Sequence, residues 1–504
     1  MQDLRNYEST KKSMLIKICF LKEIVTANTW RLMTMNDDVN VIAPRVRAVE
    51  NMVARSREKT NSKQGGPACV NCHVKMWLSF FFDGTGNHRD NDFPRNHSNV
   101  AALFDAHIDD RGNAIASLYY QGIGTPFEFK DRYERTPTMT RDGNVIWTDT
   151  NGYKEDESSW NKGFGGGLEN RLEKALFDFQ AIVELQQSKT RVDEINIAIF
   201  GFSRGSTEAR AFANWLSNHS KIKISGNTLT YAGIPLNFKF LGIFDTVESV
   251  GGAGVNKRPK LVKISLPSYI QKCLHIVAAH ELRAAFPLTH LGTNRYAQAV
   301  YPGAHADVGG GYADKEQGRN NKLARLALLQ MLDHARGAGL KMLSLKEMQN
   351  SKLWKSFYGP SYDVPAAHHS ALKNYMNNVK KTSGPINEVM TSHMELYWGW
   401  IDSGLAMQDL EQKRAALPDG YRNPNDKSLR VMEHLLQSDG RTRAARSGIP
   451  DPSSKQTVAP EVEYFFENYV HDAYEHFSLS GGTLMTDMTF ADYYKIRTIL
   501  APQA

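Results

Sequence analysis

The chain has 504 residues, of which 41% are hydrophobic, and its formal net charge is +7 from 61 basic and 54 acidic side chains. A chain of this length can bury a sizeable core, so we expect one large α/β domain with insertions, or that domain plus a smaller one. The charge is spread without a long basic block, which argues against a nucleic-acid partner and only weakly for an anionic surface. The cysteines are too sparse for a disulfide framework: Cys19, Cys69, Cys72 and Cys273.

The first apolar run, at residues 14–21, is interrupted by Lys17 and is not followed by a small-residue cleavage site. This pattern fits neither a signal peptide nor a membrane span, and no other apolar run approaches the length needed to cross a bilayer. We interpret residues 1–75 as a flexible, polar lead-in with no catalytic role. Any membrane contact is therefore expected to be peripheral.

The run Cys69-Val70-Asn71-Cys72-His73 matches the pattern that attaches c-type haem, and it could equally supply part of a metal site or a disulfide. No export signal and no second cysteine pair accompany it. The sequence therefore favours ordinary thiols at this place and predicts no cofactor.

Residues 77–82 predict a buried strand, which leads into the turn-forming loop Asp83-Gly84-Thr85-Gly86-Asn87. In serine hydrolases a loop at this end of a strand supplies the second oxyanion donor, so Gly84 and Thr85 are candidate donors. The alternative is a turn in which Asp83 only caps the next segment. A helix at 98–104 and a strand at 117–121 follow, and this alternation is typical of a doubly wound α/β sheet.

The centre of the chain carries Gly201-Phe202-Ser203-Arg204-Gly205 between an apolar strand at 195–200 and a helix. This arrangement predicts a nucleophile elbow, in which a strained serine is exposed between strand and helix. Ser203 is then the nucleophile, and the backbone N–H of Arg204 at the helix start is an oxyanion donor. An ordinary turn is the alternative, since Gly-x-Ser-x-Gly also occurs by chance.

Residues 238–244 predict a further strand, and Asp245 stands at its carboxyl end. An acid at a strand tip beside the elbow can orient a catalytic histidine. The alternative is that Asp245 caps the following segment.

Residues 297–301 predict the next strand, which leads into a glycine-lined loop that carries His305. This placement makes His305 the candidate general base. Asp307 is close enough in sequence to assist His305 or to be a weak cation ligand, so a structural calcium ion is left open. His471, in an aromatic segment predicted to be helical, is the alternative base.

Residues 76–339 are predicted to form the catalytic core, and residues 340–456 a long helical insertion that is most simply a cap over the site. Its large apolar residues suit contact with lipid headgroups if they are exposed, or they form a small core of their own. Residues 457–504 are expected to return to the core. The large apolar residues of the cap are Trp354, Tyr358, Tyr375, Met376, Tyr397, Trp398 and Trp400.

Five short segments together resemble the α/β-hydrolase domain of the first family of type VI secretion lipase effectors. They occur in the family's order between about residues 76 and 312. The resemblance implies an α/β-hydrolase-like fold, with a mostly parallel central sheet flanked by helices. The segments are Phe82-Asp83-Gly84-Thr85-Gly86-Asn87, Gly201-Phe202-Ser203-Arg204-Gly205, Phe244-Asp245-Thr246-Val247, Glu281-Leu282-Arg283 and His305-Ala306-Asp307-Val308-Gly309-Gly310-Gly311-Tyr312.

The same resemblance implies an antibacterial phospholipase A that is made in the bacterial cytoplasm without a signal peptide. Such an effector is loaded on the spike protein of the type VI system and acts in the target cell's periplasm, at the surface of the inner membrane. Its implied partners are membrane phospholipids, the spike protein and a cognate immunity protein.

Carried across from the family, Ser203 is the nucleophile, Asp245 the orienting acid and His305 the base. The family's late Val-His-Asp-Ser appears here as Val470-His471-Asp472-Ala473, with alanine in the last place. Two histidines therefore compete for the role of base. The rival functions are a serine esterase acting on small soluble esters or peptides, and a non-catalytic toxin module that binds membranes through the cap.

Overall fold

The structure is a computed structural model that describes residues 42–61, 69–130, 135–139, 145–149, 152–155, 167–248, 262–283, 285–416, 457–473, 494 and 496–502. The chain divides into two compact units, Met1–Pro44 and Arg45–Ala504. The fold described here is that of the second unit.

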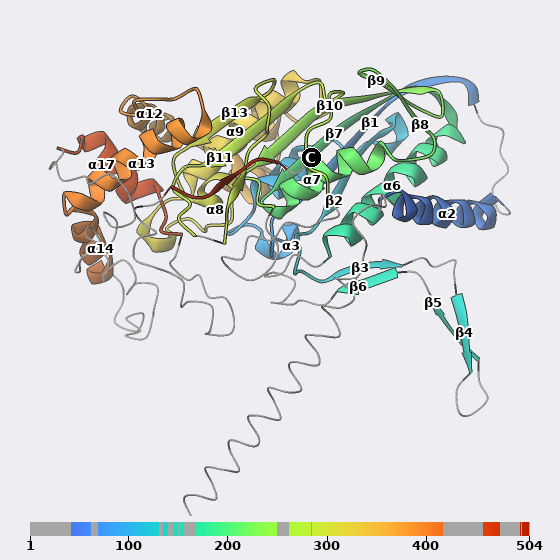
Figure 1. Ribbon diagram of the computed structural model, residues 1–504, viewed down its shortest axis with the longest axis horizontal. Helices are drawn as coiled ribbons and strands as arrows, with labels where there is room; N and C mark the ends of the chain where they lie inside the picture. Colours follow the sequence, from blue (N-terminus) through green and yellow to red (C-terminus); the bar gives the residue numbers. More distant parts are fainter. Residues whose placement is uncertain are drawn as a thin grey trace, which may run out of the picture. The chain divides into compact units, whose positions relative to one another are not determined.

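A mostly parallel sheet forms the centre of this unit (Figure 1). Among the described residues it has eight strands, and the neighbours in the order β13-β11-β10-β7-β1-β2 all run parallel. A hairpin of β8 and β9 continues the sheet antiparallel to β10. The strands are β1 (Cys69–Phe82), β2 (Ile115–Tyr120), β7 (Thr190–Phe202), β8 (Ile222–Ser225), β9 (Thr228–Tyr231), β10 (Ile234–Phe244), β11 (Cys273–Ala278) and β13 (Ala297–Tyr301).

The parallel strands end at the same edge of the sheet. Phe82 of β1 pairs with Gly201 of β7, Phe202 of β7 pairs with Phe244 of β10, and Phe244 pairs with Ile276 of β11. The residues that follow each strand are therefore brought to one edge, which is where open α/β sheets bind their ligands.

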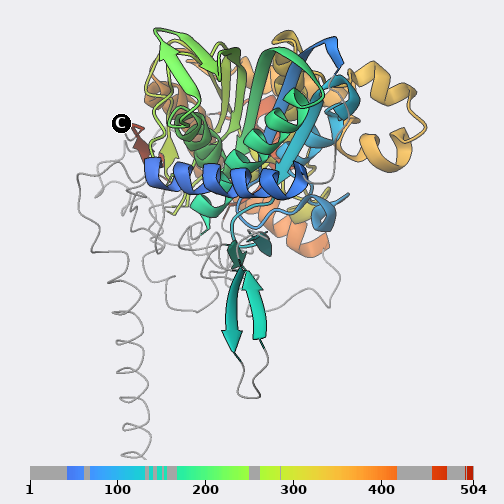
Figure 2. The same cartoon turned by 90° about the vertical axis from the view of Figure 1, so that its right-hand side faces the viewer.

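Helices cover both faces of the sheet (Figures 1 and 2). Because side chains alternate along a strand, Phe80 and Phe82 of β1 pack on Phe212 of α7, with ring centroids 4.7 and 5.7 Å away. Phe81 points to the other face and belongs to a core shared with α4 and α9. One face is covered by α6 (Leu168–Gln187) and α7 (Arg204–Leu216), and the other by α4 (Asn99–Ala106) and α9 (Lys322–Gly337).

All five strands predicted in the core are present, as β1, β2, β7, β10 and β13. The helix predicted at 98–104 is α4, and Ser98 Oγ caps it by accepting the N–H of Ala101. β11 and α9 were not predicted. Shorter elements connect these: α3 (Arg89–Asp92), a 3-10 helix (Arg111–Asn113), β3 (Phe127–Lys130) paired with β6 (Gly152–Glu155), β4 (Arg135–Met139) paired with β5 (Val145–Asp149), β12 (Leu288–Thr289), α8 (His305–Gly309) and a 3-10 helix (Glu316–Gly318).

The prediction of a flexible lead-in is wrong where the structure describes that segment. Ile42–Asn61 form a helix, α2, and Arg45 Nη1 donates to Glu173 Oε1 of α6 at 3.0 Å. β1 begins at Cys69, before the predicted start at residue 77. A narrow apolar face in a highly charged sequence explains why the helix was missed, and its buried side chains are Val46, Val49, Met52 and Val53. Residues 1–41 and 62–68 lie outside the described residues.

The region predicted to be a cap is helical, but its aromatic side chains form a core and not an exposed face. Tyr375, Tyr397 and Trp400 are buried in one cluster with Phe465 and Phe466. Residues 417–456 of the predicted cap lie outside the described residues. The elements are α10 (Leu345–Asn350), a π-helix (Trp354–Tyr358), α11 (Gly359–Tyr362), α12 (Ala366–Met376), α13 (Ile386–Asp402), α14 (Leu405–Ala416) and α17 (Pro460–Tyr469).

The first part of this region belongs to the main core, because Met348, Tyr358 and Tyr362 pack with α4 and α9. Near the end of the chain, β14 (Ile499–Leu500) pairs in parallel with β12 in a two-stranded sheet of its own. None of the helices that the structure describes is long and apolar enough to span a membrane.

Phe466 provides a test of the aromatic cluster, since its ring is fully buried against Tyr397 and Trp400. Phe466→Ala is expected to lower the free energy of unfolding by about 3–5 kcal/mol, because it leaves a cavity. Tyr464→Ala, on the same helix but 53% exposed, is the control and is expected to change stability little. Urea unfolding followed by tryptophan fluorescence measures both variants. Equal stabilities would show that the cluster is not a core.

Candidate active site

Ser203 lies between β7 and α7 in a strained backbone conformation, with φ 58° and ψ −123°. Its N–H donates to Phe244 O at 3.0 Å, and its carbonyl accepts the N–H groups of Ser206 and Val247. These bonds hold the strained residue to the end of β10. Asp245 also has a positive φ, of 42°, so both residues are kept in conformations that the surrounding structure must enforce.

The glycines on either side of Ser203 allow the strand and the helix to approach closely. A Cβ on Gly205 would lie 2.2 Å from Phe82 O and 2.4 Å from Asp83 O. A Cβ on Gly201 would lie 2.4 Å from Gly205 O. The obstacles are backbone atoms, which cannot rotate away, so only glycine fits at these two positions.

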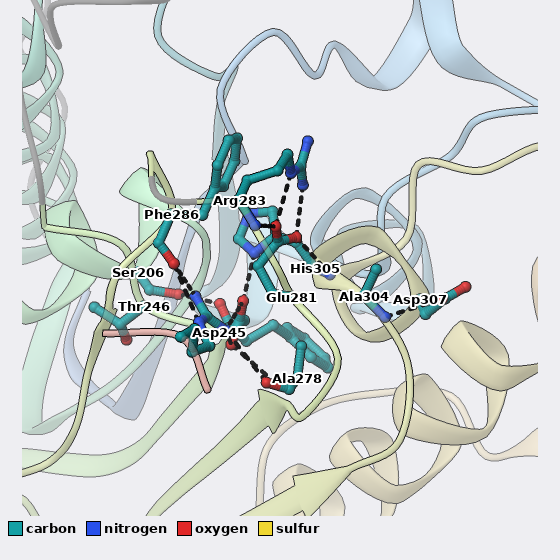
Figure 3. Close-up of polar contacts among 12 residues, drawn as sticks. Ser206, Asp245, Thr246, Ala278, Glu281, Arg283, Phe286, Ala304, His305 and Asp307 are labelled. Carbon is teal, nitrogen blue, oxygen red and sulfur yellow. Dashed lines mark hydrogen bonds and ion pairs between the residues drawn. The ribbon is translucent and has the colours of Figure 1, made fainter. Parts of the chain in front are cut away.

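Asp245 and His305 form a buried hydrogen-bonded pair (Figure 3). His305 Nδ1 lies 2.5 Å from Asp245 Oδ2, and the imidazole packs on the rings of Phe202 and Phe286 at centroid distances of 4.6 and 5.1 Å. Phe202 immediately precedes Ser203 in the chain. The structure thus brings the predicted acid and the predicted base together, and the base contacts the residue that precedes the predicted nucleophile.

His305 is the first residue of a short helix, α8, and does not lie in a loop as predicted. Its N–H donates to Glu281 Oε2 at 3.2 Å. The same carboxylate accepts two bonds from the Arg283 side chain, at 2.8 and 2.7 Å (Figure 3). Glu281 and Arg283 therefore help to position the backbone of the histidine.

The electrostatics of the pair favour an ionised acid and a neutral base. Burial alone would raise the pKa of Asp245, but the charge of Arg497 and the hydrogen bond from His305 hold it well below its ordinary value. Burial lowers the pKa of His305, although Asp245 opposes this. Nδ1 of a neutral His305 donates to the ionised carboxylate, so Nε2 is left as the basic nitrogen.

Arg497 is a member of the site that sequence reasoning missed. Its Nη1 donates to Asp245 Oδ1 at 2.6 Å and to Oδ2 at 2.8 Å, and neither side chain is exposed. The residue lies 252 positions after Asp245 in the chain. Its position just before β14 would have been the only indication, and the pairing of β14 with β12 has no clear sequence pattern.

His471 lies just beyond the end of α17 and pairs with a different acid. Its Nδ1 lies 2.6 Å from Asp307 Oδ1, and its N–H donates to Asp307 Oδ2 at 3.0 Å. Asp307 Oδ2 also accepts the N–H of Ala304, and Tyr312 stacks on the imidazole at 4.1 Å. His471 therefore ties the segment after α17 to the helix that carries His305.

The candidate cation ligand Asp307 thus has both carboxylate oxygens engaged. Across the part of the chain that the structure describes, no group of three or more His, Cys, Asp or Glu side chains could hold a metal ion. The structural calcium ion stays a prediction. So does the role of Cys69 and Cys72, whose side chains lie outside the described residues.

The candidate oxyanion loop follows β1. Asp83 does not act as a simple cap: its carboxylate accepts the N–H of Gly84 at 2.7 Å and the hydroxyls of Ser98 and Tyr119 at 2.8 and 2.6 Å. Burial raises the pKa of Asp83 to about 6, although these hydrogen bonds lower it. The N–H of Gly84 is already used. That of Thr85 donates to no described residue, so it is the better placed of the two candidates.

Gly205→Ala tests the close approach at the elbow. At an ordinary helix position alanine is favoured over glycine by about 0.5–1 kcal/mol, but here the new Cβ meets backbone of β1, so the melting temperature is expected to fall. Gly337→Ala, at the end of α9, is the matched control because its Cβ would meet no atom within 4 Å. Thermal unfolding compares the two. A Gly205→Ala protein as stable as the control would contradict the close packing of the elbow on β1.

Comparison with known proteins identifies the family of the chain. A model described as the catalytic domain of Tle1-like type VI secretion phospholipase effectors matches residues 78–230 and 225–334, together just over half of the chain. No curated protein matches.

The solved structures that are similar include two that are described here in turn. A crystal structure of an uncharacterized protein from Pseudomonas aeruginosa is 18% identical, with 91% of this chain and 82% of that chain covered and a TM-score of 0.55, which supports the fold alone. The Tle1 effector bound to the VgrG spike of the type 6 secretion system is 16% identical, with 66% of this chain and 84% of that chain covered and a TM-score of 0.39. On the match of the catalytic-domain model, together with the α/β-hydrolase-like sheet, this chain belongs to the Tle1-like family of type VI secretion phospholipase effectors.

Proposed function

We propose that the chain is a serine hydrolase of the phospholipase A type (A1 or A2), which cleaves acyl esters of membrane glycerophospholipids through an acyl-enzyme. The observation that carries the proposal is the strained Ser203, whose N–H bonds the residue before Asp245 and whose preceding residue, Phe202, packs on His305 of the buried Asp245–His305 pair. Family membership supports phospholipids as the substrate class.

In the proposed reaction His305 Nε2 takes the proton of Ser203 Oγ as the oxygen attacks the ester carbonyl carbon. The N–H groups of Arg204 and Thr85 hold the oxyanion, and the start of α7 adds the positive end of the helix dipole. The imidazolium then protonates the departing alkoxide, which leaves as a lysophospholipid. Water, deprotonated by His305, hydrolyses the acyl-enzyme and releases a fatty acid.

We assign the base to His305 rather than His471. His305 contacts Asp245 and the residue next to Ser203, whereas His471 is paired with Asp307 and stacked on Tyr312. His471 acts in this proposal through packing: it fixes the helix that carries His305. No step requires a metal ion.

The proposed setting follows the family of type VI effectors. The protein is made in the bacterial cytoplasm, is carried by the spike protein of the secretion system, and acts in the target cell's periplasm at the inner membrane. A cognate immunity protein then protects sister cells. This setting makes the activity antibacterial.

Ser203→Ala tests the function. The variant is expected to stay folded and to lose several orders of magnitude of hydrolysis, because only the oxyanion hole and substrate binding remain. Mass spectrometry of phospholipid vesicles digested by each protein measures the loss and identifies the acyl position that is cleaved. A folded variant that retains a tenth of the activity would contradict the assignment.

Two further outcomes separate the rival functions. Activity on soluble esters that does not rise on vesicles would favour a soluble-ester hydrolase, and toxicity that survives Ser203→Ala would favour a non-catalytic toxin.

The wild-type protein is expected to kill cells efficiently when it is directed to the periplasm and only weakly when it stays in the cytoplasm. Equal killing from both compartments would count against the proposed setting.

The pH dependence and a pair of variants test the base. His305 must be neutral to accept a proton, and burial lowers its pKa. As the pH decreases, kcat/KM is therefore expected to fall only at pH values below the ordinary pKa range of histidine.

His305→Ala is expected to lose about as much activity as Ser203→Ala, and the double variant is expected to lose little more than either. His471→Ala is expected to lower the stability of the fold and to leave most of the activity of the folded protein. Loss of activity in a folded His471→Ala protein, with activity kept in His305→Ala, would transfer the role to His471.

A further inference from the structure

All three nitrogens of the Arg497 guanidinium donate hydrogen bonds to acceptors among the described residues. Nη1 donates to both oxygens of Asp245 and, at 3.3 Å, to Ala278 O. Nε and Nη2 of Arg497 donate to Phe286 O at 3.1 and 2.6 Å. The planar guanidinium therefore has a single orientation, which the backbone on one side and the carboxylate on the other define.

The Asp245 carboxylate is equally constrained. Oδ1 accepts Arg497 Nη1 at 2.6 Å and the N–H of Ala278 at 2.9 Å, while Oδ2 accepts His305 Nδ1 at 2.5 Å and Arg497 Nη1 at 2.8 Å. Each oxygen thus has two partners, and rotation of the carboxylate would break several charge-assisted bonds together. Only one of these partners, Arg497, carries a permanent positive charge.

We propose that Arg497 is a positioning residue of the active site, whose guanidinium keeps the Asp245 carboxylate ionised and turned toward His305. This inference rests on the proposed function, because it assigns Arg497 a part in activating Ser203. It also makes the segment around β14 a part of the catalytic machinery, although that segment lies far from the other site residues in the sequence.

The charges around Asp245 determine how the pH dependence of activity would change if Arg497 were removed. Without Arg497, burial would dominate and the pKa of Asp245 would rise, so the acid–base pair would take up a proton at a higher pH. Since the protonated pair cannot accept the proton of Ser203, the acidic limb of the activity profile would move to higher pH. Among the described residues, the other titratable or charged groups that interact with Asp245 or with its two partners are His275 of β11, and Glu281 and Arg283 after β11. Arg210 of α7 acts on His275.

A purely structural role for Arg497 is the competing explanation, because Arg497 also holds Phe286 O and the segment before β14. Arg319 offers a matched control for that role. It is also buried, it donates to Asp409 Oδ2 at 2.8 Å, and it bonds the carbonyls of Gln317 and Phe466. None of its described contacts involves Ser203, Asp245 or His305.

The experiment measures the rate at which a fluorophosphonate probe labels Ser203 between pH 4 and 9. Arg497→Gln, which is neutral but keeps hydrogen-bond donors, is expected to label about ten to a hundred times more slowly at pH 7. Its acidic midpoint is expected to rise by about one pH unit. Arg497→Lys, which restores the charge, is expected to return the midpoint toward the wild-type value. Arg319→Gln is expected to lose stability and keep both the rate and the midpoint.

The outcomes separate the inference from the proposed function. A folded wild-type protein that is not labelled contradicts the proposed function and the inference with it. A labelled wild-type protein, with an unchanged midpoint in folded Arg497→Gln, contradicts the inference alone. So does a shift of equal size in Arg319→Gln.

A double-variant comparison decides the matter if Arg497→Gln does not fold. Asp245→Asn and Asp245→Asn/Arg497→Gln are then compared, since the second removes both buried charges together. Equal labelling rates of these two proteins support the inference, because Arg497 acts through Asp245. A further loss of tenfold or more in the folded double variant overturns it.

Discussion

A carboxylate without contact with water stays ionised only if hydrogen-bond donors and positive charge replace the water it has lost. Asp245 meets this condition with groups from three separate parts of the chain: the N–H of Ala278 at the end of β11, the imidazole at the start of α8 and the guanidinium of Arg497. The parallel sheet brings the first two together at its edge, and the pairing of β14 with β12 brings the third. Much of the long-range order of the unit therefore serves to keep one negative charge in place.

The short helix α8 carries one member of each of two buried His–Asp pairs, His305 of the first and Asp307 of the second, and the surroundings of the two pairs differ. Asp245 is reinforced by an arginine, and its histidine packs against the residue before the strained serine. Asp307 instead accepts two backbone N–H groups, from Ala304 and His471, so it fastens two segments to each other. Under the proposed function, the same hydrogen bond between the same residue types supports proton transfer in one place and holds backbone together in another.

Much of the site could be predicted because its patterns are local. A buried strand followed by Gly-x-Ser-x-Gly, or by an aspartate, is visible within a dozen residues. β11 was missed because His275 interrupts its apolar run, although that histidine is buried and bonded to Thr246 and Gln298. The helix at His305 is too short to show a helical period. Arg497, and the burial of the cap aromatics, depend on which distant segments pack together, and one sequence carries no record of that.

The separation of 252 residues between Asp245 and Arg497 has a consequence for the order of folding. Contacts between segments far apart in the chain form late, because a large loop must close before they can contribute. The elbow needs only a strand and the helix that follows it, and the acid–base pair needs the neighbouring strands of the sheet. Asp245 is synthesised long before its arginine, and water must solvate the carboxylate in the interval. We therefore expect this edge of the sheet to remain hydrated in the nascent chain, so that the protein acquires its activity in one of the last steps of its folding.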